Sequence, residues 1–126
     1  MASRQPLSIV IRIPNVTLSR SDLETALGLS LDRYEPTTDH ATGYAQIDIP
    51  DDRDQWAAAL DCAQSLCEPF QRLVAESLIG SPGFDVAAGF PSSALSKSLA
   101  IPAQLAAAAG EAGMDIEISV YRTESD

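Results

Sequence analysis

The sequence predicts an α+β fold, a two-layer sandwich in which about four mostly antiparallel or mixed strands carry helices on one face. Four segments alternate apolar and polar residues with a period of two, and the segments between them place apolar residues at helical spacing. Because the alternation leaves each strand with one polar face, helices are not expected on both sides of the sheet. The four strand segments are Ser8–Ile13, Tyr44–Ile49, Phe84–Phe90 and Asp115–Tyr121.

The first helix is expected to follow Ser21-Asp22-Leu23-Glu24, which has the pattern of a capping box. In that motif the Ser21 hydroxyl accepts a bond from a backbone amide of the first turn, while Glu24 reaches back to the start of the helix. Gly28 is expected to end or weaken this helix. The polar connection Leu31–Gly43 follows, either as a loop throughout or with a short edge strand inside it.

The second helix is expected to start near Asp51–Asp54, whose carboxylates suit the positive end of a helix dipole. Pro69 is expected to kink or restart it, because proline lacks an amide and clashes with the preceding turn. Six apolar residues at helical spacing are expected to face the core. They are Trp56, Leu60, Ala63, Cys67, Phe70 and Val74.

Ser81-Pro82-Gly83 predicts a turn before the third strand, and Phe90 to Lys97 predicts a loop after it. A third helix is expected to begin at Pro102, a favoured first helical position, and to end at Gly110 or Gly113. The resulting order is β-α-β-α-β-α-β, with room for one extra strand.

The chain length of 126 residues suits one domain over residues 1–126, with short disordered ends expected at 1–5 and 123–126. No run of about 18 consecutive apolar residues is present, so no membrane-spanning helix is expected. The polar start of the chain lacks the apolar core of a secretory signal. The cytoplasm is therefore the expected location.

The charge of the chain is acidic and uneven. Eighteen acidic residues oppose eight basic ones, and no acid occurs before Asp22. A net charge of −10 disfavours contact with nucleic acid and anionic membranes and favours encounter with a basic protein. Background acidity of a soluble protein is the alternative explanation.

Several polar residues are expected to share one open sheet face if the strands lie side by side. The pattern allows three interpretations of this face: a solvated surface, a concave protein-binding surface or a small-molecule site. Its expected members are Arg12, Tyr44, Gln46, Asp48, Asp85, Asp115, Glu117 and Tyr121.

The sequence offers little that predicts catalysis. His40, the one histidine, stands in a polar loop, and no G-x-S-x-G or phosphate-binding glycine motif occurs. Cys62 and Cys67 lie five apart in a helix, which suits neither a local disulfide nor a C-x-x-C redox pair. We therefore expect no catalytic residues, no metal ligands and no cofactor.

Two segments carry a resemblance to a known family. Thr17–Gly28 reads as a leucine-serine entry, a helix and a leucine-glycine end, and Leu99–Tyr121 reads as a helix, a glycine cap and a final acidic strand ending in tyrosine. Together they resemble a family of small bacterial proteins of unassigned function, some of which serve as toxin-immunity proteins. The tryptophan usual on the family's second strand is absent here, and Tyr44 or Trp56 replaces it loosely.

The resemblance implies an α+β fold and no established catalytic residues. With the acidity, it leads to the hypothesis of an immunity or antitoxin-like protein that occludes a basic, cytosol-acting toxin. The oligomeric state stays open. A small-ligand or regulatory module, using the sheet face or the space beneath Leu31–Gly43, is the alternative, and an enzyme centred on His40 is a third possibility. The expected partner contacts are Tyr34, Glu35, Asp39, Asp51, Asp52, Asp54, Asp115, Glu117 and Tyr121.

Overall fold

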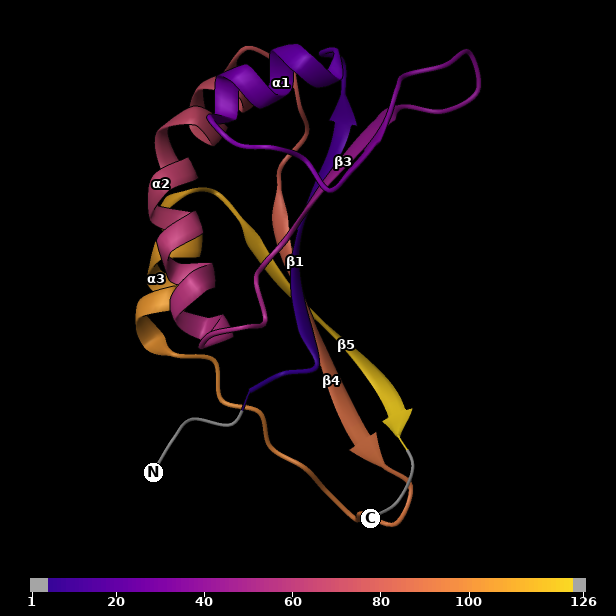
Figure 1. The fold of residues 1–126 in the computed structure, drawn as a ribbon, viewed down its shortest axis with the longest axis vertical. Helices are drawn as coiled ribbons and strands as arrows, with labels where there is room; N and C mark the ends of the chain where they lie inside the picture. Colours follow the sequence, from indigo (N-terminus) through magenta and orange to yellow (C-terminus); the bar gives the residue numbers. More distant parts are fainter. Residues whose placement is uncertain (1–4, 124–126) are drawn as a thin grey trace.

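A mixed five-stranded sheet with three helices on one side makes up the computed structural model, which describes residues 5–123 (Figure 1). The α+β prediction is confirmed. The extra strand lies in the polar connection Leu31–Gly43, where the sequence allowed either a loop or a short edge strand. In chain order the elements are β1 (Ser8–Val16), α1 (Arg20–Leu27), β2 (Arg33–Glu35), β3 (Gly43–Asp48), α2 (Gln55–Ala75), β4 (Gly83–Pro91), α3 (Ala103–Glu111) and β5 (Asp115–Thr123).

The strands lie in the order β2-β3-β1-β4-β5, with β1 at the centre. β1 pairs antiparallel with both β3 and β4, and β2 pairs antiparallel with β3. β4 and β5 are parallel, which requires a crossover connection, and α3 lies within it. The sheet is therefore mixed, and β2 and β5 form its two edges.

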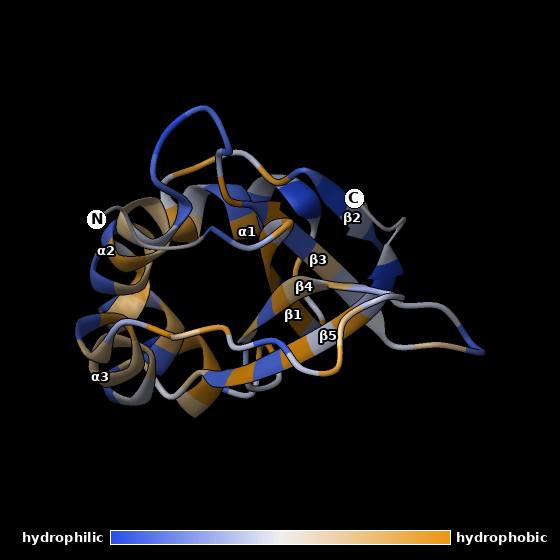
Figure 2. Cartoon of the chain, turned by 90° about the horizontal axis from the view of Figure 1, so that it is seen from below, coloured by the Kyte–Doolittle hydropathy of each residue, from blue (hydrophilic) through white to orange (hydrophobic). Residues whose placement is uncertain are grey.

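The core lies between the helices and one face of the sheet. Ile9, Ile11 and Ile13 of β1 are almost completely buried, and Phe84 and Val86 of β4 are buried beside them. Figure 2 shows orange, apolar positions alternating with blue or pale ones along the strands, as the period of two predicts. The helices cover one face of the sheet (Figure 1), and the registers place the alternate side chains of these strands on the other face.

The start of α1 differs from the capping box. Ser19 is the N-cap, and its Oγ accepts the Asp22 amide at 3.1 Å. Glu24 instead accepts the Leu31 amide at 2.8 Å and so holds the chain that enters β2. This bond lowers the pKa of Glu24. The helix begins two residues earlier than expected, because the Ser19 hydroxyl, and not that of Ser21, accepts a hydrogen bond from a backbone amide of the first turn. Gly28 ends the helix with a φ of +72°.

Replacing the two serines separately should distinguish the caps. We expect Ser19→Ala to lower the free energy of unfolding by about 1 kcal/mol, because the Asp22 amide loses its partner. Ser21→Ala, at an exposed site inside the helix, should change it by less than about 0.5 kcal/mol. Urea unfolding of both variants measures the difference, and a larger loss for Ser21→Ala would contradict Ser19 as the cap.

α2 runs without interruption through Pro69, so the expected restart does not occur. Of the residues predicted to face the core, Trp56, Ala63 and Phe70 are buried, whereas Leu60 and Cys67 are partly buried. Val74 is 37% exposed, and Leu66 and Leu73 take the inner positions instead. The helix is rotated about its axis relative to the expected stripe, because it packs against the β-sheet and against α3 together.

The α3 helix begins at Ala103, with Pro102 in the cap position, and Gly113 follows its end with a φ of +73°. The predicted disordered ends fall almost wholly on residues 1–4 and 124–126, which lie outside the described residues. Gln5 and Thr123 are described: the Gln5 Oε1 accepts the Gln55 amide at 2.8 Å, and Thr123 pairs with Pro91.

Candidate interaction face

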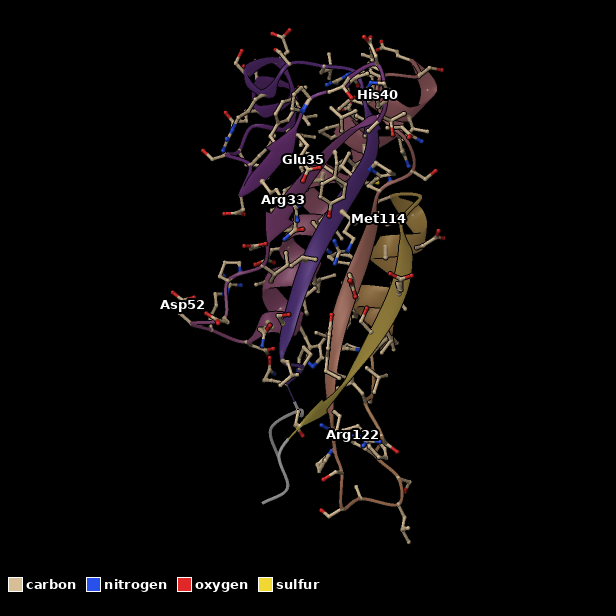
Figure 3. All side chains as sticks on the ribbon, turned by 90° about the vertical axis from the view of Figure 1, so that its right-hand side faces the viewer. Arg33, Glu35, His40, Asp52, Met114 and Arg122 are labelled. Carbon is tan, nitrogen blue, oxygen red and sulfur yellow. The ribbon has the colours of Figure 1, made fainter. Side chains whose placement is uncertain are left out.

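The uncovered side of the sheet, called here the open face, gathers polar side chains from all five strands (Figure 3). The pairing registers place Arg12 beside Gln46, Asp85 beside Glu117 and Gly83 beside Asp115. Because side chains alternate along a strand, residues of matching parity share this face. Its members are Arg12, Arg33, Glu35, Tyr44, Gln46, Asp48, Asp85, Asp115, Glu117, Ser119 and Tyr121.

An ion pair between β1 and β4 lies at the centre of the open face. The Arg12 Nε and Nη2 donate to Asp85 Oδ2 at 3.0 and 2.8 Å, and the Ser119 hydroxyl donates to Asp85 Oδ1 at 2.7 Å. Asp85 is only 7% exposed although it lies on the uncovered side. The hydrogen bond to Asp85 raises the pKa of the Arg12 guanidinium above the ordinary value for arginine. The three side chains connect β1, β4 and β5.

A second chain of hydrogen bonds continues from Arg12 along β3. Arg12 Nη1 donates to the Tyr44 hydroxyl at 2.7 Å, which donates to Gln46 Oε1 at 3.0 Å. Gln46 Nε2 donates to Asp48 Oδ1 at 2.8 Å. The Arg33 guanidinium lies 5.5 Å from the centre of the Tyr44 ring, in cation–π range. These contacts hold the polar side chains in fixed positions before any partner arrives.

Gly43 positions Tyr44 at the start of β3. The pairing of β1 with β3 has a bulge between Pro14 and Val16, and a Cβ at Gly43 would lie 2.2 Å from the Val16 carbonyl oxygen. This close approach of two backbones requires glycine. The Thr37 hydroxyl accepts the Gly43 amide at 3.0 Å and donates to the same Val16 oxygen at 2.6 Å.

Two shallow depressions flank Tyr44 on the open face. One, of about 330 Å³, reaches Asp115 and Glu117, and the other, of about 390 Å³, reaches Arg33 and Glu35. Arg12, Pro14 and Tyr44 border both. Within the described residues, Asp115 and Glu117 form no salt bridge, so the depression on their side is bordered by two free carboxylates.

Four of the nine predicted partner contacts lie on the open face. Glu35, Asp115, Glu117 and Tyr121 are all exposed there. Tyr34 is not: it lies on the helix side of β2, is partly buried against the core, and its hydroxyl donates to the Leu18 carbonyl at 2.6 Å. The parity of β2 explains this difference, since neighbouring residues of a strand point to opposite faces.

The other four predicted contacts lie elsewhere. Asp39 is exposed in the loop between β2 and β3, beside His40 in sequence. Asp51 and Asp52 are exposed in the bend before α2, and Figure 3 shows Asp52 projecting at a separate corner of the molecule. Asp54 is the N-cap of α2, where its Oδ1 accepts the Trp56 amide at 3.0 Å. The helix start explains Asp54 without a partner.

The reactive side chains do not assemble into a catalytic arrangement among the described residues. His40 is exposed at the tip of its loop, and its side chain makes no hydrogen bond there. Burial raises the pKa of the Cys62 thiol, which disfavours its nucleophilic thiolate form. In the same part of the chain, no group of three or more His, Cys, Asp or Glu residues is placed to hold a metal ion.

Two members of the open face were missed by sequence reasoning. Arg33 lies in β2, which has three residues and therefore too little alternation to predict a strand face. Ser119 was not among the expected members, because its role depends on the hydrogen bond to Asp85 of the neighbouring strand, which the sequence of β5 does not reveal. The alternation predicted the face itself correctly, because Arg12, Tyr44, Gln46 and Asp48 all lie on it.

No protein-family model matches the chain, and no curated protein or solved structure matches it. Within residues 5–123, no helix has both the length and the apolar character needed to cross a bilayer.

Proposed function

We propose that this chain is a non-catalytic immunity or antitoxin-like protein that binds a basic, cytosol-acting toxin domain on its open face. The observation that carries the proposal is the uncovered face of the sheet, where a preordered polar network borders two free carboxylates, those of Asp115 and Glu117. The resemblance of Thr17–Gly28 and Leu99–Tyr121 to a family containing immunity proteins supports the same conclusion.

The physical chemistry of the open face suits a cationic protein surface. The net charge of −10 speeds encounter with a basic partner, and free carboxylates at the face give the encounter a direction. Because Tyr44, Gln46 and Arg12 are already held by hydrogen bonds, little side-chain entropy is lost when a partner covers them. Tyr121, exposed on the same face, adds an aromatic contact of the kind enriched in binding hot spots.

Co-expression tests the proposal directly. The protein is produced together with the product of the adjacent gene, when that product is toxic on its own, and growth and complex formation are both measured. Restored growth with a stable complex is the expected result. Toxicity that persists at equal expression, without binding of the purified proteins, would refute the proposed function.

Charge reversal on the open face should weaken the complex selectively. We expect Asp115→Lys with Glu117→Lys to slow association at low salt by about tenfold or more and to abolish growth protection, because the free carboxylates become repulsive. Asp51→Lys with Asp52→Lys changes the net charge equally at the separate corner shown in Figure 3. Stopped-flow or surface-binding kinetics compare the two.

If both double variants slow association equally, net charge and not the open face steers binding. Unchanged association in the Asp115 and Glu117 variant would remove the open face from the interface.

A small-ligand module remains the second candidate, and one depression favours it. An apolar hollow of about 210 Å³ lies between β4, β5 and the connection after β4, with Lys97 at its border. This volume is small for a metabolite site, since ligand pockets usually measure about 300–1,000 Å³. A thermal-shift screen of metabolites tests this candidate, and a hit lost in Lys97→Ala would support it.

A further inference from the structure

The outer half of β5 carries apolar side chains that the protein covers only in part, since Ile118 and Val120 border the open hollow beside Lys97 and Leu99. Ile118 and Val120 point to the helix side of the sheet, where the alternation predicts burial. They are nevertheless 43% and 65% exposed. In Figure 1, β4 and β5 extend beyond the helix layer, which explains why these two residues lack full cover. The alternation thus assigns these residues to the correct side of the sheet, but it does not show that the helices end before reaching them.

β5 is also an edge strand of unusual length for an unprotected edge. It has nine residues, and within the described residues its backbone hydrogen bonds reach no strand other than β4. The opposite edge, β2, has three residues and carries the ion pair of Arg33 and Glu35. Proteins protect edges by shortening them and placing charges on them. β2 has both kinds of protection, whereas β5 carries charges but keeps nine residues of backbone along its edge.

The charges along β5 indicate which strand fits this edge. Its first half holds Asp115 and Glu117, and its second half holds Arg122 with no described acid. A second β5 in antiparallel orientation would separate the acidic halves of the two strands and place Arg122, on the helix side of the sheet, beside Ile116 of the other copy. A parallel arrangement would place acids beside acids, which is unfavourable.

We propose that β5 pairs antiparallel with β5 of a second copy, forming a symmetric dimer with one continuous sheet. The register centred on Ser119 pairs all nine residues. On the helix side it places Ile118 of each copy opposite Val120 of the other, so the exposed apolar residues cover one another. On the open face it places Glu117 opposite Tyr121 and Asp115 opposite Thr123, so no two carboxylates face each other.

This inference does not depend on the proposed function. Self-pairing through the same surface on both copies is the isologous arrangement of a two-fold dimer. The two open faces then continue into one another and stay free to bind. The net charge of −10 on each copy opposes association, so salt that screens this repulsion should strengthen the dimer.

Sedimentation equilibrium of the full chain, at about 5 to about 300 µM and at low and high salt, tests the dimer. We expect the mass to rise with concentration from 13.4 kDa to twice that value, and to rise earlier at high salt. Val120→Lys should weaken self-association by about tenfold or more, because it places a charge in the apolar contact. The matched control is Val74→Lys on α2, which should associate like the wild type.

Position 121 tests the register independently, with variants that leave the core untouched because Tyr121 is 53% exposed. Tyr121→Glu should weaken the dimer, since it faces Glu117 of the other copy at both ends of the pairing, and Tyr121→Lys should strengthen it. Circular dichroism confirms that each variant is folded.

Three results would overturn the proposal. The first is a wild-type chain that stays monomeric at the highest concentration and salt. The second is that Val120→Lys and Tyr121→Glu both associate as tightly as the wild type. The third is that Val120→Lys and Val74→Lys weaken association equally.

Discussion

Phe70→Ala is expected to lower the free energy of unfolding by about 3–5 kcal/mol. The Phe70 side chain is completely buried where α2 meets the sheet. Its removal loses the transfer free energy of the ring and leaves a cavity that the surrounding structure cannot fully close. Urea or thermal unfolding with a two-state fit measures the change.

Val74→Ala is the matched control on the same helix, one turn further along. The sequence pattern treats Phe70 and Val74 alike, whereas the structure leaves Val74 37% exposed. We expect a change of less than about 0.5 kcal/mol for Val74→Ala. Comparable losses in both variants would contradict the rotation of α2 that brings Leu66 and Leu73 inward.

Arg12→Met is expected to lower the free energy of unfolding by about 2 kcal/mol. The substitution keeps the length of the side chain but leaves the buried Asp85 carboxylate without its cation. Loss of one partner of a fully buried pair costs about 3–5 kcal/mol. The Arg12 side chain is 44% exposed and Asp85 keeps the Ser119 hydroxyl bond, so solvent and this bond reduce the loss.

Arg33→Met is the control for the Arg12 substitution. Arg33 pairs with Glu35 on the same face, but both side chains are at least half exposed. A surface pair of this kind contributes about 0–1 kcal/mol, so we expect a small change. Adding Asp85→Asn to Arg12→Met should recover part of the stability, because the buried charge disappears. Equal effects of Arg12→Met and Arg33→Met would show that Asp85 does not depend on its cation.

The fold class could be predicted because its signals are local. The period of two in β1, β3, β4 and β5 needs no knowledge of neighbouring strands, and Gly28 and Gly113 end helices through their own backbone freedom. β2 was harder, since three residues carry almost no periodic signal. The cap of α1 was misplaced because Ser19 and Ser21 are chemically equivalent donors and acceptors two residues apart.

For the candidate site, the local alternation predicted which residues share a face but not which of them contact one another. Alternation assigned Asp85, Asp115 and Glu117 to one face, but it could not tell that Asp85 is buried under Arg12 and Ser119 while the other two stay free. Those contacts depend on β1 and β5 both lying next to β4, a pairing between residues 73 and 34 positions apart in the chain. Tyr34 was predicted to be an exposed partner contact because it stands in a polar segment. That segment contains β2, and the strand turns Tyr34 toward the core.

By itself, the sequence determined the four longer strands, the three helices, the acidic charge and the polar face of those strands, because these follow from backbone preferences and residue spacing. The tertiary structure alone decided the strand order, the burial of Asp85 and the exposure of Val74, Ile118 and Val120. Burial depends on which element lies above a residue. That is set by contacts between distant parts of the chain, and here the helix layer ends before β5 does (Figure 1).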